Sequence, residues 1–300
     1  MRPLVAVVGP TAVGKSALAV ELALAVDGEV VNADSMQLYV GMDVGTAKIT
    51  VEERRGVPHH LLDVWPVTRT ASVARYQEQA LSAIADIRER GRTPVLVGGS
   101  GLYVNAVTDR WDFPGTDPQV RSALEAELVL VGPQGLHDRL ARLDPEAADS
   151  IDPGNGRRLV RALEVVQLRG SFAARLPEVA DDPEVVLLGL TLPRPELDTR
   201  IEARVGRMWE AGLVEEVRGL VDQGLRDGLT ASRALGYAQV LRFLDGRTSE
   251  SQARQATVQA TRRFVRRQES WFRRDPRIRW LEADDPHLVA LTVRLAGARP

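Results

Sequence analysis

The sequence contains no cysteine in its 300 residues. Disulfides, thiolate metal sites and cysteine nucleophiles are therefore excluded, and the absence is consistent with a reducing cytoplasm. No apolar run approaches the length of a membrane span. The apolar run near the N-terminus is interrupted by Gly9, Pro10 and Lys15, which is not the pattern of a signal peptide. We therefore expect a cytoplasmic protein that has no membrane partner.

The chain also has no net positive charge, and it contains little lysine. The formal net charge is −2, so the surface as a whole is not basic. The 39 basic residues include only two lysines, Lys15 and Lys48. Such a skew reflects genome composition, in which arginine replaces lysine wherever either serves. A compact ammonium can enter a narrow phosphate cradle that a planar guanidinium cannot. This favours a phosphate role for Lys15 and leaves chance as the alternative for Lys48.

One short segment carries a phosphate-binding pattern. Gly9–Ser16 reads GPTAVGKS and matches G-x-x-x-x-G-K-S. A β-branched run at Leu4–Val8 precedes it, and Lys15–Val26 follows with apolar residues at four-residue spacing. The motif requires this order of strand, loop and helix. The residues predicted to surround a phosphate or diphosphate are Gly9, Pro10, Thr11, Ala12, Val13, Gly14, Lys15 and Ser16.

The identity of that phosphate ligand is open at this point. Lys15 would neutralise phosphate oxygens, and the Ser16 hydroxyl could hold Mg²⁺. A P-loop ATPase or GTPase usually places an aspartate at the end of an apolar strand to anchor the metal. The candidate strand Pro94–Val97 is instead followed by two glycines and Ser100, with no acid. The glycines would allow a ligand to approach the backbone, with the Ser100 hydroxyl beside it. This weakens the case for nucleotide hydrolysis.

The order of expected elements predicts an α/β protein. Apolar strands alternate with amphipathic helices, which indicates a doubly wound parallel sheet with helices on both faces. The expected strands are Glu29–Asn32, Pro94–Val97 and Val185–Leu190, and the long helix between the first two is Ala71–Arg90.

The middle of the chain shows helical patterns without a strand, so residues 112–182 are predicted to form an all-helical insertion into a core of residues 1–111 and 183–300. Helices expected in the insertion are Val120–Leu130, Gln134–Leu143 and Arg157–Arg169. The C-terminal third is expected to be mostly helical, with helices at Glu196–Ala211, Leu213–Gln223, Ser232–Leu244 and Ser249–Phe272.

Asp34 follows the second expected strand. Ligands of open α/β sheets bind at the carboxyl ends of the strands, where the phosphate loop also lies. A carboxylate there can accept a proton from a nucleophile or help to hold Mg²⁺. The alternative is a local role in a cap or turn, which is common for Asp before Ser.

A basic helix near the C-terminus indicates a polyanionic partner. Between residues 261 and 280 there are eight arginines against two acids. At 100° per residue, the core stripe is predicted to comprise Ala253, Thr257, Ala260, Phe264 and Trp271. The arginines cover one sector away from it: Arg262, Arg266 and Arg273 lie opposite, and Arg263, Arg267 and Arg274 lie on one flank. Nucleic acid is the expected partner, with a merely solvated basic face as the alternative.

Two other groups of residues are less specific. His59 and His60 are adjacent, so they cannot share one face as a metal pair, and we interpret them as turn or core residues. Arg204 and Arg233 could clamp diphosphate oxygens, since arginine binds such groups with two hydrogen bonds. Taken alone, each is better interpreted as a surface arginine.

These motifs together resemble one family. The segments GPTAVGKS, NADSMQLYVGMDVGTAK, PHHLLD, VGGSGLY, RRLVRALEV, RALGY and TRRFVRRQESWFRRDPRIRW are similar, in this order, to those of the bacterial tRNA dimethylallyltransferases. The resemblance spans essentially the whole chain, and Asp34–Lys48 is its most specific block. It implies a kinase-like P-loop core with a helical insertion. It also implies transfer of a dimethylallyl group from dimethylallyl diphosphate to N6 of adenosine 37 in the tRNA anticodon stem-loop.

The resemblance also implies roles for particular residues. Thr11–Ser16, with Arg204, would bind the prenyl diphosphate and Mg²⁺, with Ser16 as the metal ligand. Asp34 would be the catalytic base, with Ser100 beside it. The expected tRNA contacts are Asp34, Ser35, Met36, Gln37, Lys48, Arg157, Arg158, Arg233, Gly236, Tyr237, Thr261, Arg262, Arg266, Arg267 and Gln268. A monomer is expected.

Two positions depart from the family pattern, and two rival functions are considered. Ser100 stands where the family usually has Thr, and Arg157 stands where a Gln usually precedes Arg158. A small-molecule kinase also pairs a P-loop with an Asp after the second strand, but it needs neither the basic helix nor the Asp34–Lys48 block. A regulatory nucleotide-binding module would leave Asp34 without a role.

Overall fold

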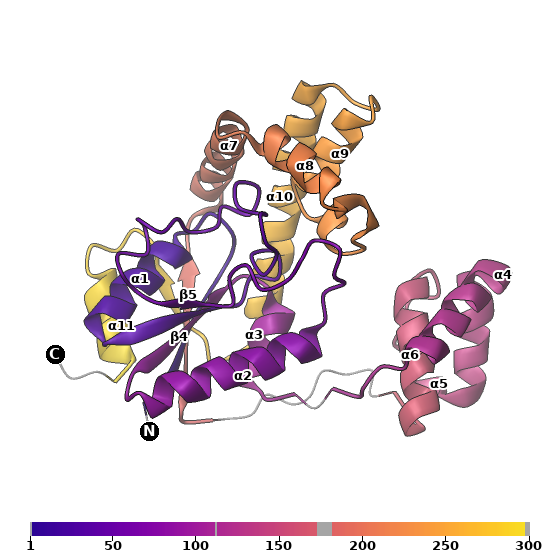
Figure 1. Ribbon diagram of the computed structural model, residues 1–300. Coiled ribbons are helices and arrows are strands. Elements are labelled where there is room, and N and C mark those ends of the chain that lie inside the picture. The colour runs from indigo at the N-terminus through magenta and orange to yellow at the C-terminus, as the bar shows by residue number, and fades with distance from the viewer. Residues whose placement is uncertain (1, 112, 173–181, 298–300) are drawn as a thin grey trace. The chain divides into compact units, whose positions relative to one another are not determined.

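The computed structural model describes residues 2–111, 113–172 and 182–297. The chain divides into two compact units, which are coloured by position in Figure 1. Unit 1 comprises Met1–Arg110 and Asp181–Pro300, and unit 2 comprises Trp111–Ala180. The predicted boundary at residue 112 falls on a position outside the described residues. In the described residues no helix is long and apolar enough to cross a membrane.

Unit 1 contains the predicted parallel sheet. In the part of the chain that the structure describes, six strands pair in the order β3-β2-β4-β1-β5-β6, and every pairing is parallel. The strands are β1 Leu4–Val8, β2 Gly28–Asn32, β3 His59–His60, β4 Thr93–Gly98, β5 Val185–Thr191 and β6 Arg279–Glu282. The α/β fold class is confirmed. Strands β3 and β6 were not predicted, because each is too short for a period-2 pattern to emerge.

The central strand β1 shows why these segments form strands. Its five residues are all buried. Ala6 and Val8 point into one hydrophobic cluster, and Val5 and Val7 point into a second cluster on the other face. Successive side chains of a strand point to opposite faces, so a strand covered on both sides must be apolar throughout.

Helices cover both faces of the sheet. The α-helices in the described part of unit 1 are α1 Lys15–Ala25, α2 Val73–Glu89, α3 Gly101–Thr108, α7 Arg194–Glu210, α8 Leu213–Asp222, α9 Tyr237–Leu244, α10 Glu250–Phe272 and α11 Leu288–Leu295. The prediction of one helix over Ser232–Leu244 is wrong. A short 3₁₀ turn at Ala231–Arg233 precedes α9, and Gly236 separates the two with a φ of 87°. The 3₁₀ turn ends at extended Ala234, and Gly236, with its positive φ, is the N-cap of α9.

Unit 2 is helical in its described part, with α4 Pro118–Leu143, α5 Pro145–Asp149 and α6 Gly156–Arg169. Gly132 has a φ of 70° and precedes Pro133, which divides α4 near the gap between the two helices predicted there. The unit has its own hydrophobic cluster, which includes Leu124, Leu136, Leu140, Leu159 and Leu163.

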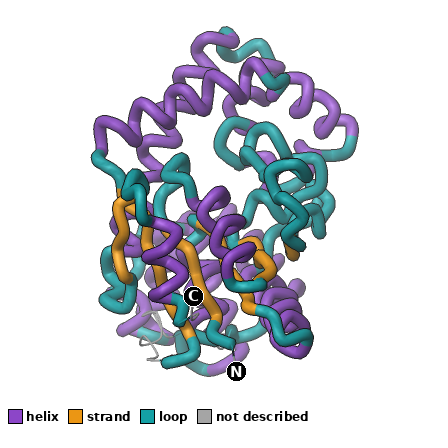
Figure 2. The backbone as a smooth tube through the Cα atoms, turned by 90° about the vertical axis from the view of Figure 1, so that its left-hand side faces the viewer, coloured by secondary structure: helices purple, strands orange, loops and turns teal. Residues whose placement is uncertain are grey.

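The strand register brings three loops to one edge of the sheet. Val8 pairs with Gly98, and Asn32 pairs with Val97, so β1, β2 and β4 end at the same level. Figure 1 shows α7, α8 and α9 beyond this edge of the sheet. In Figure 2 loops lie between the strands and these helices. The carboxyl edge of the sheet is therefore enclosed between loops and helices, as expected for a ligand site.

Candidate active site

The segment Gly9–Ser16 forms the loop between β1 and α1. Gly9, Ala12 and Gly14 have φ values of 137°, 66° and 106°. A Cβ on Gly9 would lie 2.7 Å from the backbone oxygen of Leu190, so that position requires glycine. These turns bend the backbone around the space in front of α1, which is the shape of a phosphate-binding loop.

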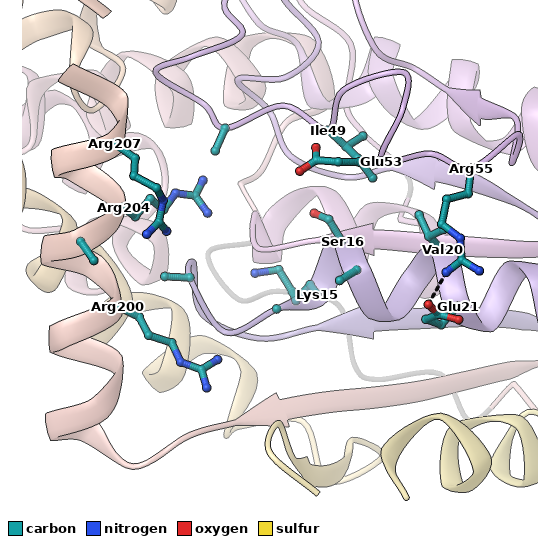
Figure 3. Close-up of a pocket in the computed structure, with 15 residues that line it drawn as sticks. Lys15, Ser16, Val20, Glu21, Ile49, Glu53, Arg55, Arg200, Arg204 and Arg207 are labelled. Atoms are coloured by element: carbon teal, nitrogen blue, oxygen red, sulfur yellow. Dashed lines mark hydrogen bonds and ion pairs between the residues drawn. The ribbon is translucent and has the colours of Figure 1, made fainter. Parts of the chain in front are cut away.

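A large cavity opens in front of this loop. It has a volume of about 660 Å³, and Lys15 and Ser16 line it together with three arginines of α7. Figure 3 shows Arg200, Arg204 and Arg207 on one side of the cavity and Lys15 on the other. The arginine spacings of four and three residues place all three on one helix face. The sequence analysis identified only Arg204, although this spacing also contained the signal for its two neighbours.

The Lys15 ammonium is held within the loop. Its Nζ donates a 2.6 Å hydrogen bond to the backbone oxygen of Pro10. Burial lowers the pKa of Lys15 to about 7; Asp34 opposes this shift and Arg204 adds to it. Burial also lowers the pKa of Arg204, again against the effect of Asp34. A bound polyanion would relieve the mutual repulsion of these two cations.

Asp34 occupies the loop after β2 in a tightly fixed geometry. Its Oδ1 accepts a 2.9 Å hydrogen bond from the N–H of Met36, and its own N–H donates to Asn32 Oδ1 at 2.9 Å. The neighbouring Ser35 lies 3.2 Å from the hydroxyl of Ser100 through both its N–H and its own hydroxyl. The turn interpretation of Asp34 is therefore confirmed, because one oxygen closes a turn, and its role toward a ligand stays a prediction. Among the described residues the other oxygen has no hydrogen-bond donor, and it is available to a ligand.

A second cavity, of about 300 Å³, contains Asp34 and Ser100. Arg204 lines this cavity as well as the first, so the two cavities adjoin at its side chain. The guanidinium is fixed there by a 3.0 Å hydrogen bond to the backbone oxygen of Thr46. The apolar part of the wall includes Met36, which was a predicted site residue, and also Ile201, Val205, Met208, Leu235 and Phe264, which were not.

Helix α10 contributes one wall of the second cavity through Thr257, Thr261, Phe264 and Arg267. The predicted core stripe is correct for its first half only. In the second half the buried positions are Val265, Gln268 and Phe272, while Phe264 faces the cavity. A single stripe fails here because the helix passes from the core to the edge of a cavity.

Gln268 is buried, with 5% of its surface exposed. It accepts a 2.9 Å hydrogen bond from the N–H of Thr11 and donates one of 2.9 Å to the oxygen of Gly99. A Cβ on Gly99 would lie 2.2 Å from the Gln268 amide nitrogen, and one on Gly98 would lie 2.4 Å from the backbone of Ala33. The glycines at the end of β4 therefore admit other protein segments, which corrects the expectation that they admit a ligand.

Lys48 and Tyr237 also lie inside the protein, at 8% and 0% exposure. Lys48 Nζ contacts Asp43 at 2.6 Å and Asp63 at 2.5 Å. The hydroxyl of Tyr237 donates to Glu216. The geometry gives Lys48, Tyr237 and Gln268 structural partners, and their expected contact with tRNA stays a prediction.

The other predicted tRNA residues are more accessible. Arg233, Arg266 and Arg267 are exposed, and the first and last line the second cavity. Arg262 is paired with Glu202 at 3.2 Å. The remaining predicted positions in unit 1 are Ser35, Met36 and Thr261, which line the second cavity, Gln37, which bonds the oxygen of Thr46, and Gly236, which is the N-cap of α9. Arg157 and Arg158 are exposed in the first turn of α6, in unit 2.

The paired histidines have structural surroundings. His60 Nε2 lies 2.6 Å from a carboxylate oxygen of buried Glu29, and His59 Nδ1 lies 2.8 Å from the oxygen of Val57. No group of three or more His, Asp or Glu side chains that could hold a metal occurs in the residues described. A metal bound at the loop would therefore take most of its ligands from water and from the phosphate ligand.

Fold and site together define a P-loop α/β protein in which a cationic cavity adjoins a second cavity with a fixed carboxylate. A family model described as IPP transferase matches residues 37–275, and the chain belongs to this family.

The names of similar proteins agree with this family. A tRNA dimethylallyltransferase of Thermobifida fusca is 65% identical over 295 residues, covering 96% of this chain and 92% of the relative. The crystal structure of a tRNA isopentenylpyrophosphate transferase of Bacillus halodurans is 42% identical, with a TM-score of 0.74, over 99% of this chain and 97% of that one. A eukaryotic dimethylallyltransferase acting on tRNA shares the fold, with 24% identity, a TM-score of 0.86, and coverage of 100% of this chain and 81% of that one.

Proposed function

We propose that the protein transfers a dimethylallyl group from dimethylallyl diphosphate to N6 of adenosine 37 in the anticodon loop of tRNA. The observation that carries this proposal is the arrangement of two cavities that adjoin at Arg204. One has the cations that a diphosphate needs, and the other has a carboxylate that can accept a proton. The names of the relatives support the same donor and acceptor classes.

The first cavity binds the leaving group in this proposal. N–H groups of the Gly9–Ser16 loop, the N-terminus of α1, Lys15 and Arg204 stabilise the charge that grows on diphosphate as its bond to the allylic carbon breaks. The allylic cation character is delocalised over three carbons, so the protein does not need to supply a nucleophile of its own. No phosphoryl group is transferred, which is consistent with the absence of an acid after β4.

The second cavity binds the acceptor. An exocyclic adenine amine is a weak nucleophile because its lone pair is delocalised into the ring. As its nitrogen bonds to the allylic carbon, an N6 proton becomes acidic, and the free oxygen of Asp34 accepts it. Ser100 holds Ser35 and thereby the loop that carries Asp34. The adenosine must leave its stack to reach this site, which suits an anticodon loop.

Mg²⁺ belongs to the proposal as a cofactor. The Ser16 hydroxyl lines the first cavity and is an oxygen donor suited to a hard cation, which would otherwise use diphosphate oxygens and water. When bound, the ion would add positive charge to the diphosphate and so make it a better leaving group.

The tRNA backbone is proposed to lie on the basic residues of α10 and near Arg233, with further contacts from Arg157 and Arg158 of unit 2. Each phosphate neutralised by an arginine releases counterions and strengthens binding at low salt. We also propose that the protein acts as a cytoplasmic monomer; a light-scattering mass of two chains at working concentration would contradict the monomer.

One assay tests the reaction. The protein is incubated with labelled dimethylallyl diphosphate, Mg²⁺ and unmodified tRNA, and in parallel with labelled ATP and candidate acceptors. We expect label in tRNA, located at N6 of adenosine 37 by nucleoside analysis, and its loss in Asp34→Ala. Turnover of ATP with unlabelled tRNA would instead identify a kinase.

A further inference from the structure

The carboxylate of Glu216 is the centre of a hydrogen-bond cluster on α8. Its Oε2 accepts from the N–H groups of Asp43 and Val44 at 3.0 and 2.6 Å. Its Oε1 accepts from the N–H of Gly45 at 3.1 Å and from the hydroxyl of Tyr237 at 2.5 Å. Three consecutive backbone N–H groups that converge in this way form an anion-binding concavity. In this protein the bound anion is a side chain from another element.

The same segment is closely packed at Gly45. A Cβ on Gly45 would lie 2.5 Å from the Tyr237 ring and 2.8 Å from Leu213. Burial, together with Glu216, raises the pKa of Tyr237 above its usual 10.0, so its hydroxyl stays protonated and donates. Lys48 binds the side chain of Asp43, the first residue of the segment, at 2.6 Å. These contacts leave the backbone from residue 43 to residue 46 little freedom to move.

That backbone ends at an active-site contact. The oxygen of Thr46 accepts from Arg204 Nη2 at 3.0 Å and from Gln37 Nε2 at 3.3 Å. Arg204 lines both cavities, and the hydrogen bond to Thr46 sets the direction of its guanidinium there. Glu216 restrains this acceptor through the three preceding N–H groups, and the Thr46 hydroxyl adds a 2.6 Å hydrogen bond to the oxygen of Met42.

We infer that Glu216 is a positioning residue that orients Arg204 toward the diphosphate through the backbone of residues 43–46. The inference rests on the proposed function only in assuming that Arg204 binds the diphosphate of the donor. Glu216 itself lines neither cavity and touches no reacting group.

Inorganic diphosphate is the probe, because its binding can be measured without any transfer reaction. In calorimetric titrations of the full chain, Glu216→Ala is expected to weaken diphosphate binding by about tenfold, the loss of one oriented charge-assisted hydrogen bond. Glu216→Gln keeps one carbonyl acceptor and should give an intermediate loss. Glu215→Ala is the matched control, because Glu215 is exposed in the same helical turn and pairs with Arg218. It should leave the affinity unchanged.

A double-mutant cycle separates positioning from general damage. In an Arg204→Ala background, Glu216→Ala should cause no further loss of affinity, since the group that it orients is gone. Equal losses in both backgrounds would overturn the inference, as would an unchanged affinity in the single variant. If Glu216→Ala does not fold, as judged by its melting transition, the same comparison is made with Glu216→Gln.

The transfer assay then distinguishes the two proposals. Glu216→Ala should raise KM for dimethylallyl diphosphate more than it lowers kcat, with little change in KM for tRNA. Suppose that the effects of Glu216→Ala and Arg204→Ala on diphosphate affinity are coupled, but the protein labels no tRNA. That result would refute the proposed function and retain the role of Glu216. Efficient labelling with an unaltered diphosphate affinity in Glu216→Ala would do the opposite.

Discussion

The side-chain oxygen of Gln268 accepts a hydrogen bond from the backbone N–H of Thr11, although the two residues are 257 positions apart. Through its amide nitrogen the same side chain also binds Gly99. The helix with the basic residues is thereby joined to the phosphate loop and to the loop after β4. Displacement of α10 would therefore alter the phosphate loop directly.

Removal of that amide should cost stability. Gln268→Ala leaves the Thr11 N–H and the Gly99 oxygen without partners, which should lower the free energy of unfolding by about 2 kcal/mol. Urea denaturation measures the change. Gln255→Ala is the control on the same helix, because Gln255 is exposed, and it should shift stability by less than about 0.5 kcal/mol. Equal effects of the two substitutions would contradict a linking role for Gln268.

Diphosphate binding should take up a proton at Lys15. Its pKa in the free protein is about 7, and a bound anion raises it because the charged form is favoured. At pH 8 most Lys15 side chains are neutral before binding and charged afterwards, so affinity should fall as pH rises above 7. Calorimetry in two buffers of different ionisation enthalpy measures this uptake. Lys15→Gln corrects for protons of diphosphate itself, and identical uptake by the two proteins would refute the assignment.

Asp34→Asn tests the base without loss of the turn. The amide oxygen can still accept from Met36 N–H, so the loop should keep its conformation, but the side chain no longer accepts a proton. We expect kcat to fall by about 10²–10⁴-fold with little change in KM for tRNA. Single-turnover transfer to tRNA is the measurement. If kcat falls less than about tenfold, another group removes the proton.

The basic surface of α10 should be visible in salt dependence. Arg267→Ala should weaken tRNA binding at low salt and reduce the slope of log K against log salt by about one, and Arg266→Ala should act in the same direction. Arg218→Ala, on α8, provides the control because Arg218 pairs with Glu215 outside both cavities. Unchanged slopes in both α10 variants would show that this surface is a solvated basic face that does not bind tRNA.

Local patterns predicted the sheet, the phosphate loop and the position of Asp34, because each depends on a short run of residues with a fixed period or spacing. Arg200 and Arg207 could have been found by the same reasoning, since they share a helix face with Arg204. The partners of Gln268 and Glu216 could not be predicted. The contacts of Gln268 with Thr11 and Gly99, and that of Glu216 with Val44, join segments more than 160 positions apart. No local periodicity encodes which distant loop a buried amide or carboxylate will meet. Conversely, the glycine at position 99 indicated from the sequence that another group approaches the backbone closely there. Only the structure shows that this group is the side chain of Gln268.

The placement of Arg204 on the boundary of both cavities limits how the two substrate sites can diverge in evolution. In the proposed function, a substitution of Arg204 that reshapes the donor site also changes a wall of the acceptor site, so the specificities for prenyl donor and for tRNA are coupled at this residue. Variants selected for a bulkier allylic donor should therefore need compensating changes at the surrounding positions of α7, such as Val205 and Met208, before they regain full use of the original RNA.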